Sequence, residues 1–195
     1  MWVKTKEMLF DFRRSDKMSV QSVIHGENVE IVQTYTYLGT VFDDKLTWDK
    51  NTDVITKKGQ QRMHLLRKLR SFSVNDNILS TFYRSFIESV LCFSFICYFF
   101  NLNVKNKNSL NRIVNVCSKI CGRQQRGLDM FCRQQISRKV RCILSTPDHV
   151  FASEFDLLPS GRRYRAPSSR TNRYKFSFIP VAIRLLNERN VEKDD

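Results

Sequence analysis

The stretch Leu79-Ser-Thr-Phe-Tyr-Arg-Ser-Phe-Ile-Glu-Ser-Val-Leu-Cys-Phe93 carries large apolar residues at intervals of three and four. That period is typical of an amphipathic α-helix, and Ser73 or Asn75 is suited to cap its start. The uncharged run from Ser89 to Val104 is sixteen residues long, whereas a membrane span needs about twenty apolar residues. We therefore expect a buried helix whose inward face carries Leu79, Phe82, Phe86, Val90, Phe93 and Cys97.

Helical patterns flank this segment on both sides. Residues 49–70 are predicted to be helical, although Gly59 costs up to about 1 kcal/mol relative to alanine. Four later helices are expected. The first ends at Gly122, the second runs from about 128 to 144, a short third begins at Thr146-Pro-Asp148, and the last runs from about 179 to 189. The inward positions before and after Gly122 are expected to be Leu110, Ile113, Val114, Cys117, Ile120 and Cys121, and Leu128, Phe131, Cys132, Ile136, Val140 and Ile143.

The first forty residues alternate in the manner of β-strands, with Met8, Phe10 and Phe12 on one face. His25-Gly-Glu-Asn28 suits a hairpin turn between residues 20–24 and 29–32. Tyr35-Thr-Tyr-Leu-Gly39 adds another short extended piece. The predicted fold class is therefore mainly α with a small β-rich N-terminal part, in which a helical bundle follows a β-hairpin.

The charge of the chain favours a polyanionic partner. Its 33 basic and 19 acidic residues give a net charge of +14 and a pI near 9.8, and the cations cluster at residues 57–70, 123–141 and 162–175. Nucleic acid is the first interpretation of such clusters, and an anionic membrane surface is the second. No cluster has consecutive cations like those of a lipid-binding tail.

The segment from Ser160 to Lys175 holds six Lys or Arg, no Asp or Glu, and two tyrosines. Arginine suits phosphate oxygens and aromatic rings stack on bases. A solvated tail is the alternative, and the aliphatic run after residue 178 argues against it. The nucleic-acid-binding residues expected here are Arg162, Arg163, Tyr164, Arg165, Arg170 and Arg173.

Residues for catalysis or metal binding are scarce. The six cysteines include no Cys-x-x-Cys pair, so we expect reduced, largely buried thiols and no zinc site. His25-Gly-Glu27 with His149 matches the spacing of an iron triad, but a turn role for His25 is favoured. Asp43-Asp44 could hold a divalent metal, and a turn before a helix is again favoured. We expect no catalytic residue, metal, cofactor or small-molecule substrate.

The order of several short motifs resembles the C-terminal part of a non-LTR, LINE-type retrotransposon reverse transcriptase. The motifs include Lys4-Thr-Lys-Glu-Met8 with Asp11-Phe-Arg-Arg14, Leu65-Leu-Arg-Lys-Leu69, Phe82 to Leu91, and Leu158-Pro-Ser-Gly-Arg-Arg-Tyr-Arg165. The resemblance implies a late-palm remnant and a thumb-like helical bundle whose catalytic aspartates would lie upstream of Lys4. It also implies primer-grip-like residues Tyr37, Leu38 and Gly39, and phosphate-facing residues Lys57, Lys58, Arg62 and Arg67.

Residues from about 23 to 70 are also similar to the N-terminal domain of AlkB homologue 8, a tRNA-modifying dioxygenase and methyltransferase. The implied alternative is a protein linked to tRNA or nucleic-acid modification. No methyl-donor glycine loop accompanies the similarity. A non-functional pseudogene product is a third hypothesis.

The expected organisation has three parts. Residues 1–45 are a β-rich remnant, 46–157 a helical body, and 158–195 a basic loop with a C-terminal helix. The expected main function is a non-catalytic, nucleic-acid-binding remnant whose partner is RNA or single-stranded DNA, with no membrane. Because Met1-Trp-Val-Lys4 is not followed by a long apolar core, an intracellular location, cytoplasmic or nuclear, is expected.

Overall fold

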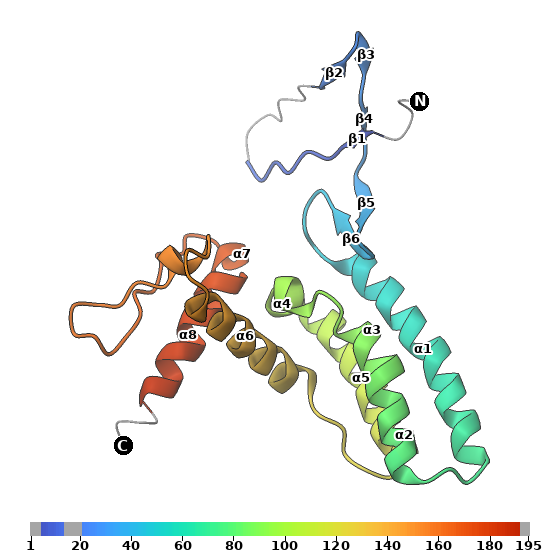
Figure 1. Cartoon of the computed structure of the whole chain (residues 1–195). Helices are drawn as coiled ribbons and strands as arrows, with labels where there is room; N and C mark the ends of the chain where they lie inside the picture. The colour runs from blue at the N-terminus through green and yellow to red at the C-terminus, as the bar shows by residue number, and fades with distance from the viewer. Residues whose placement is uncertain (1–4, 14–20, 192–195) are drawn as a thin grey trace. The chain divides into compact units, whose positions relative to one another are not determined.

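The computed structural model describes residues 5–13 and 21–191 and groups the chain into two compact units, Met1–Ile55 and Thr56–Asp195 (Figure 1). Predicted features at Lys4, Arg14 and Val20 lie outside the described residues. The mainly helical fold with small N-terminal β-hairpins is confirmed. The expected division into three parts after residues 45 and 157 stays a prediction.

The first unit contains three pairs of short strands, with bounds β1 Lys6–Glu7, β2 Val23–Ile24, β3 Glu27–Asn28, β4 Glu30–Ile31, β5 Thr34–Tyr37 and β6 Thr40–Asp43. β1 pairs with β4 in parallel, whereas β2 pairs with β3 and β5 with β6 in antiparallel register. Both antiparallel pairs close through two residues of positive φ, His25-Gly26 and Leu38-Gly39. Such a turn matches the twist of the strands and favours glycine at its second position.

The first unit has a small core at the start of the long helix α1 (Asp49–Ser71). Val41, Trp48 and Ile55 are buried, and the Val41 amide donates to the buried Asn51 side chain at 3.1 Å. The expected apolar face of the first strand does not form a core, because Phe10 and Phe12 are about half exposed.

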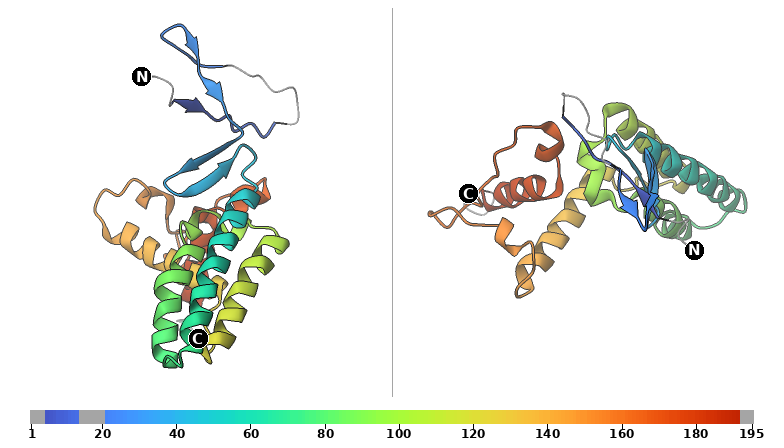
Figure 2. Two further views of the ribbon diagram at one scale, coloured as in Figure 1. Left: turned by 90° about the vertical axis from the view of Figure 1, so that its right-hand side faces the viewer. Right: turned by 90° about the horizontal axis from the view of Figure 1, so that it is seen from above.

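The second unit is helical, with bounds α2 Asp76–Phe82, η1 Tyr83–Glu88, α3 Ser89–Leu91, α4 Phe95–Tyr98, η2 Phe99–Asn101, α5 Val104–Cys121, α6 Leu128–Ser145, η3 Ala152–Glu154, α7 Asn172–Lys175 and α8 Phe178–Val191. The later part of α1 lies beside the α2–α3 helix and α5 (Figures 1 and 2). A Cβ placed on Gly59 of α1 would lie 3.0 Å from Ile113 and 3.1 Å from Leu91, so the glycine permits close helix packing.

The helix around residues 79–97 buries a different face from the one expected. Leu79 is buried, but Phe86 and Phe93 are about half exposed and Cys97 is exposed. The buried stripe is instead Leu79, Tyr83, Ile87, Leu91, Phe95 and Tyr98. On an ordinary α-helix, residues spaced by four rotate around the helix axis by about 40° per step. The wider π-helical turn η1 reduces this rotation, so the stripe stays on one side. The helix then breaks at Ser94, whose φ is +54°.

The later helices form mostly as predicted. Gly122 has a φ of +66° and ends α5, and the inward residues of α6 are buried except for half-buried Phe131. The expected helix at Thr146-Pro-Asp148 is wrong: Thr146 is extended, Asp148 has a φ of +54°, and the helical turn is η3. Left-handed backbone at Asp148 cannot continue a right-handed helix.

The linker between α5 and α6 is fixed to the helices by buried polar contacts. The Gln125 amide donates to Ser118 Oγ at 3.0 Å, and the Arg126 guanidinium lies 3.1 Å from a Glu88 carboxylate that is 7% exposed. α6 then packs on α4 and α8. Among the described residues no single helix is long and apolar enough to cross a membrane. The helical segments 76–91 and 95–101, which are bent against each other, reach that length and apolar character only when counted together.

Candidate nucleic-acid interface

The exposed surface of α1, here called the α1 face, carries four cations. Gly59, Met63 and Leu66 are buried on the opposite face. At about 100° per residue, Lys57 and Lys68 point away from this buried stripe, whereas Lys58 and Arg67, which are nine positions apart, lie on its two flanks. Besides Arg70, the exposed cations of α1 after residue 56 are Lys57, Lys58, Arg67 and Lys68.

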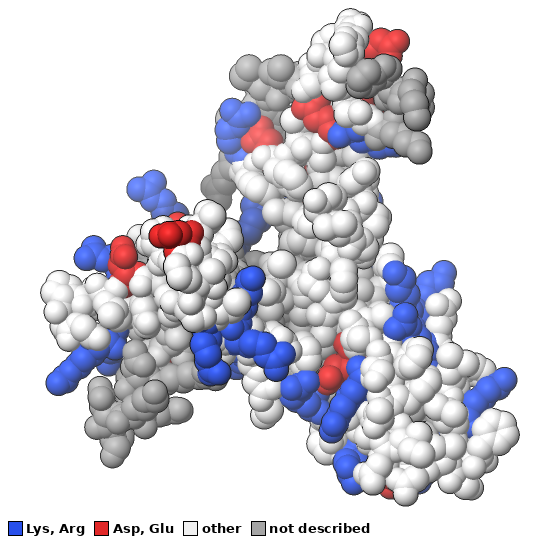
Figure 3. Space-filling model, viewed as in Figure 1, with Lys and Arg blue, Asp and Glu red and all other residues white. Residues whose placement is uncertain are grey.

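These cations are not neutralised by acidic neighbours. Within the part of the chain that the structure describes, the α1 cation in an ion pair is Arg70, which meets Asp76 of α2. No described Asp or Glu forms an ion pair with Lys57, Lys58, Arg67 or Lys68. Figure 3 shows many Lys and Arg side chains over the helices and fewer acidic ones. The face therefore has positive charge available for a polyanion.

Arg62 lies differently from the other predicted α1 residues. Its side chain is half-buried, and its Nη1 donates to the backbone carbonyl of Phe86. The guanidinium has five N–H donors, so this bond leaves donors for a further acceptor. Arg62 thus joins α1 to η1.

An aromatic pair lies where α2 continues into η1, the element that Arg62 contacts. The Phe82 and Phe86 rings stack with centroids 4.9 Å apart, and Phe86 is 52% exposed. An exposed ring beside cations is the combination that single-stranded nucleic acids use, since bases stack on the ring while phosphates meet the charge. The sequence prediction placed Phe86 in the core and missed this role.

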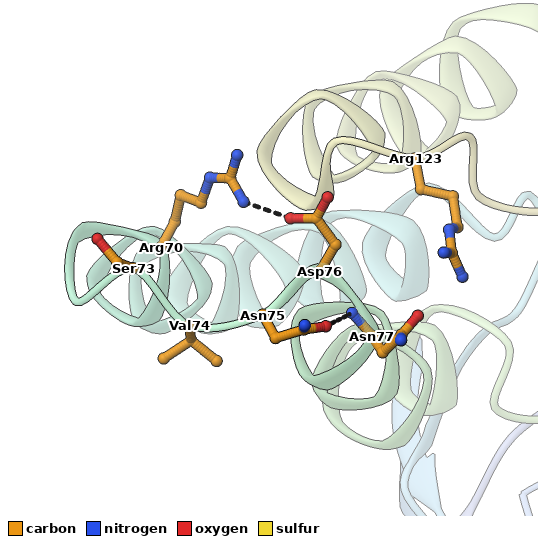
Figure 4. Close-up of a pocket in the computed structure, with 7 residues that line it drawn as sticks. All are labelled: Arg70, Ser73, Val74, Asn75, Asp76, Asn77 and Arg123. Carbon is orange, nitrogen blue, oxygen red and sulfur yellow. Dashed lines mark hydrogen bonds and ion pairs between the residues drawn. The ribbon is translucent and has the colours of Figure 1, made fainter.

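A shallow depression lies where α1 ends and α2 begins, and Arg70 and Arg123 lie on its rim (Figure 4). Arg70 reaches Asp76, and the Asn75 side chain caps α2 by accepting from the Asn77 amide at 2.8 Å. Asp76 offsets the charge of Arg70, so an anion here would meet one unneutralised arginine. The depression is therefore a weaker anion site than the open face of α1.

The predicted basic loop is folded back on itself. The Leu158 amide donates to the Arg163 carbonyl and the Arg165 amide to the Asp156 carbonyl, both at 2.8 Å. The Tyr164 amide donates to Oδ1 of Asn187 in α8 at 2.8 Å, and Asn187 Nδ2 donates to the Tyr164 carbonyl at 3.1 Å. The loop is thus anchored, and the solvated-tail alternative does not describe it.

The loop leaves its cations exposed but not its tyrosine. The Tyr164 ring is half-buried and packs edge-on against buried Phe155. This packing makes Tyr164 an anchor of the loop in the described structure, while its proposed contact with a base stays a prediction. The exposed cations of the loop and of α7 are Arg162, Arg163, Arg165, Arg170, Arg173 and Lys175.

The predicted binding residues form separate groups. Lys57, Lys58 and Arg67 lie on α1, whereas the loop that carries Arg162, Arg163 and Arg165 is hydrogen-bonded through Tyr164 to Asn187 of α8. Tyr37, Leu38 and Gly39 lie at the tip of the β5–β6 hairpin in the first unit. The sequence prediction treated the charge as one surface because spacing along the chain does not report distance in space.

α5 presents a polar face that the sequence prediction did not select. Its 18 residues include no Asp or Glu. Its buried side carries Leu110, Ile113, Val114, Cys117 and Cys121, which turns an exposed stripe outward. That α5 stripe consists of Lys105, Asn108, Arg112, Asn115 and Lys119. The signal in the sequence was the run without acidic residues between Glu88 and Asp129.

The structure offers no ligand set for a metal ion. No group of three His, Cys, Asp or Glu among residues 5–13 and 21–191 could hold one, so the described residues do not fit an iron centre. His25 begins a hairpin turn. Asp43 accepts bonds from the amides of Thr47 and Trp48 at 3.0 Å, which is the turn role that the sequence favoured.

The comparisons with known proteins give one result. Residues 48–89, which span α1, α2 and η1, match the model of a family described as alkylated DNA repair protein alkB homolog 8, N-terminal. No curated protein and no solved structure matches the chain. The match covers less than a quarter of the 195 residues.

This match corrects two expectations. The retrotransposon reverse-transcriptase assignment is wrong, because the family model that matches is that of alkB homolog 8 and nothing found supports a polymerase. The primer-grip role of Tyr37, Leu38 and Gly39 followed from that assignment and loses its support. Similarity to alkB homolog 8 was expected over about 23–70, and it lies instead over 48–89, on the helices rather than the hairpins.

Proposed function

We propose that this protein binds RNA through its helical unit and holds it for a nucleic-acid modification reaction. The observation that carries the proposal is the surface of α1 and η1, where four exposed cations have no described acidic partner, and where Arg62 bonds the backbone of exposed Phe86, whose ring stacks on that of half-buried Phe82. The family match to alkB homolog 8 covers this same helical segment and favours RNA modification as the setting. We assign no iron-dependent step to the described residues.

The cations and the aromatic ring of this surface are proposed to contact different parts of the RNA. Lys57, Lys58, Arg67 and Lys68 neutralise phosphates, which releases counterions and makes the affinity fall with salt. Phe86 stacks on an unpaired base, a contact that depends little on salt or sequence. The loop cations Arg162, Arg163, Arg165, Arg170 and Arg173 are proposed to extend the contact along the same RNA.

The proposal is tested by fluorescence anisotropy with the full chain and a labelled, unmodified transfer RNA transcript. The double variant K57A/K68A is expected to weaken binding roughly tenfold and to reduce the slope of log affinity against log salt by about 0.7 to 0.9 per lost phosphate contact. The matched control is K6A/R13A, which removes two cations from the first unit, each paired with an acidic residue, and should change binding little.

A second pair of variants separates stacking from charge. Phe86→Ala is expected to lower the affinity several-fold without changing the salt slope, and Phe151→Ala removes another half-exposed ring as its control. If K57A/K68A and Phe86→Ala both bind the transcript as tightly as the wild type, the α1 face is not the RNA-binding site and the proposal is rejected.

A further inference from the structure

The exposed stripe of α5 is a second candidate surface, on a different helix from the α1 face. The side chains of its five residues form no hydrogen bond or ion pair with any described residue; these residues are Lys105, Asn108, Arg112, Asn115 and Lys119. Asn115 and Lys119 line both of the shallow depressions along this side of α5. The stripe therefore combines positive charge with unoccupied amide groups.

The composition of the stripe differs from that of the α1 face. Its five side chains include no aromatic ring, so it lacks the aromatic platform on which unpaired bases stack best. It alternates two amides with three cations over the 15 residues from Lys105 to Lys119, and at about 1.5 Å per residue its ends are about 21 Å apart. Amides can both donate and accept hydrogen bonds, as the 2′-hydroxyl of ribose does.

From these observations we infer that the α5 stripe binds the backbone of double-helical RNA, with Asn108 and Asn115 contacting ribose 2′-hydroxyls and Arg112 and Lys119 contacting phosphates. The wide, shallow minor groove of an RNA helix displays its 2′-hydroxyls to a straight protein element and is recognised mainly by shape. The inference rests on the proposed RNA-binding function and deepens it. In a folded RNA, α1 and η1 hold an unpaired segment while α5 holds a neighbouring stem.

The test uses the full chain and two labelled blunt duplexes of about 16 base pairs, one of RNA and one of DNA with the same sequence. The wild type should prefer the RNA duplex. N108A/N115A should lose about tenfold in affinity for RNA, the equivalent of two hydrogen bonds, and should bind the DNA duplex unchanged. R112A/K119A should weaken binding to both duplexes and reduce the salt slope by about one per contact.

The matched control for charge is R138A/R141A, which removes two exposed cations from α6 and should leave the preference for RNA intact. Thermal unfolding of each variant, followed by circular dichroism, should match that of the wild type because the substituted side chains are exposed.

Equal affinity of the wild type for the two duplexes, or unchanged RNA binding by N108A/N115A, would overturn the inference. The inference would also be overturned if the wild type preferred single-stranded RNA to the RNA duplex and K57A/K68A abolished that preference. This result would leave the proposed function in place. Failure of the wild type to bind either the transfer RNA transcript or the duplexes would reject both.

Discussion

Asp43 shows how a single carboxylate can organise a turn. It is 7% exposed and accepts hydrogen bonds from the amides of Lys45, Thr47 and Trp48 and from the Thr47 hydroxyl. These bonds hold two residues, Leu46 and Trp48, at positive φ. A carboxylate with several amide donors is strongly hydrogen-bonded in its ionised form, so it stabilises the junction between β6 and α1 without any metal.

The pH dependence of Asp43 follows from the same contacts. Burial raises the pKa of this carboxyl, and the hydrogen bonds from Thr47, Trp48 and Lys45 lower it. Together the hydrogen bonds outweigh burial, so the pKa lies below its usual value. Because the folded pKa is depressed, the stabilisation is present above the unfolded pKa of about 3.9 and is lost as the pH falls through the folded value.

We therefore predict that the first unit loses stability below about pH 4, and that Asp43→Asn reduces this dependence while lowering stability at pH 7 by roughly 2 kcal/mol. Urea unfolding followed by Trp48 fluorescence in a Trp2→Phe background measures both effects. Asp44→Asn is the neighbouring control. Identical pH profiles for the wild type and Asp43→Asn would contradict the assignment.

Among the elements, α1 depends on a residue that disfavours helices. Gly59 is buried, and its missing side chain lets α1 approach Ile113 of α5 and Leu91 of α3. Alanine would gain up to about 1 kcal/mol of helix propensity and would push two flexible side-chain ends by a few tenths of an ångström. The two effects oppose each other.

Gly59→Ala is thus expected to change the free energy of unfolding by less than about 1 kcal/mol. Gly59→Leu should lower it by about 1–3 kcal/mol because the extra atoms overpack the interface. Chemical denaturation of both variants checks this, with exposed Gln60→Leu as the control for adding a leucine to α1. A stable Gly59→Leu protein would mean that α1 does not pack closely on α5.

The segment from α2 to α4 has two apolar faces in its sequence, which is why its buried face was predicted incorrectly. Apolar residues occur in adjacent pairs, such as Phe82-Tyr83 and Phe86-Ile87, so two faces satisfy the same period. The structure buries the second member of each pair. The choice depends on the shape offered by α1 and α5, which lie elsewhere in the sequence.

For the molecule as a whole, the thiols report how the core is packed. Cys117, Cys121 and Cys132 are buried and Cys92 is partly so, whereas Cys97 and Cys142 are exposed. Desolvation by burial is the main cause that raises the pKa of both Cys117 and Cys132 to about 12. Thiolate formation, and hence reactivity, is suppressed at such sites.

We predict that a disulfide reagent at pH 8 modifies Cys142 first and Cys97 next in the native protein, since burial raises the pKa of Cys97. The other four thiols should react only after unfolding. Mass spectrometry of timed samples identifies the sites, and Cys142→Ser should remove the fastest phase. Rapid reaction of Cys117 or Cys132 in the native protein would show that the core is open.

The helices, their approximate ends and the positive charge could be predicted from the sequence. The period of residues 110–121, the glycine at 122 and the run without acidic residues are local properties that neighbouring residues fix. The structure alone decided which apolar face of residues 79–98 is buried and that the loop around Tyr164 is anchored on Asn187. These features depend on contacts between segments far apart in the chain, and a local pattern satisfied by two faces cannot select between them.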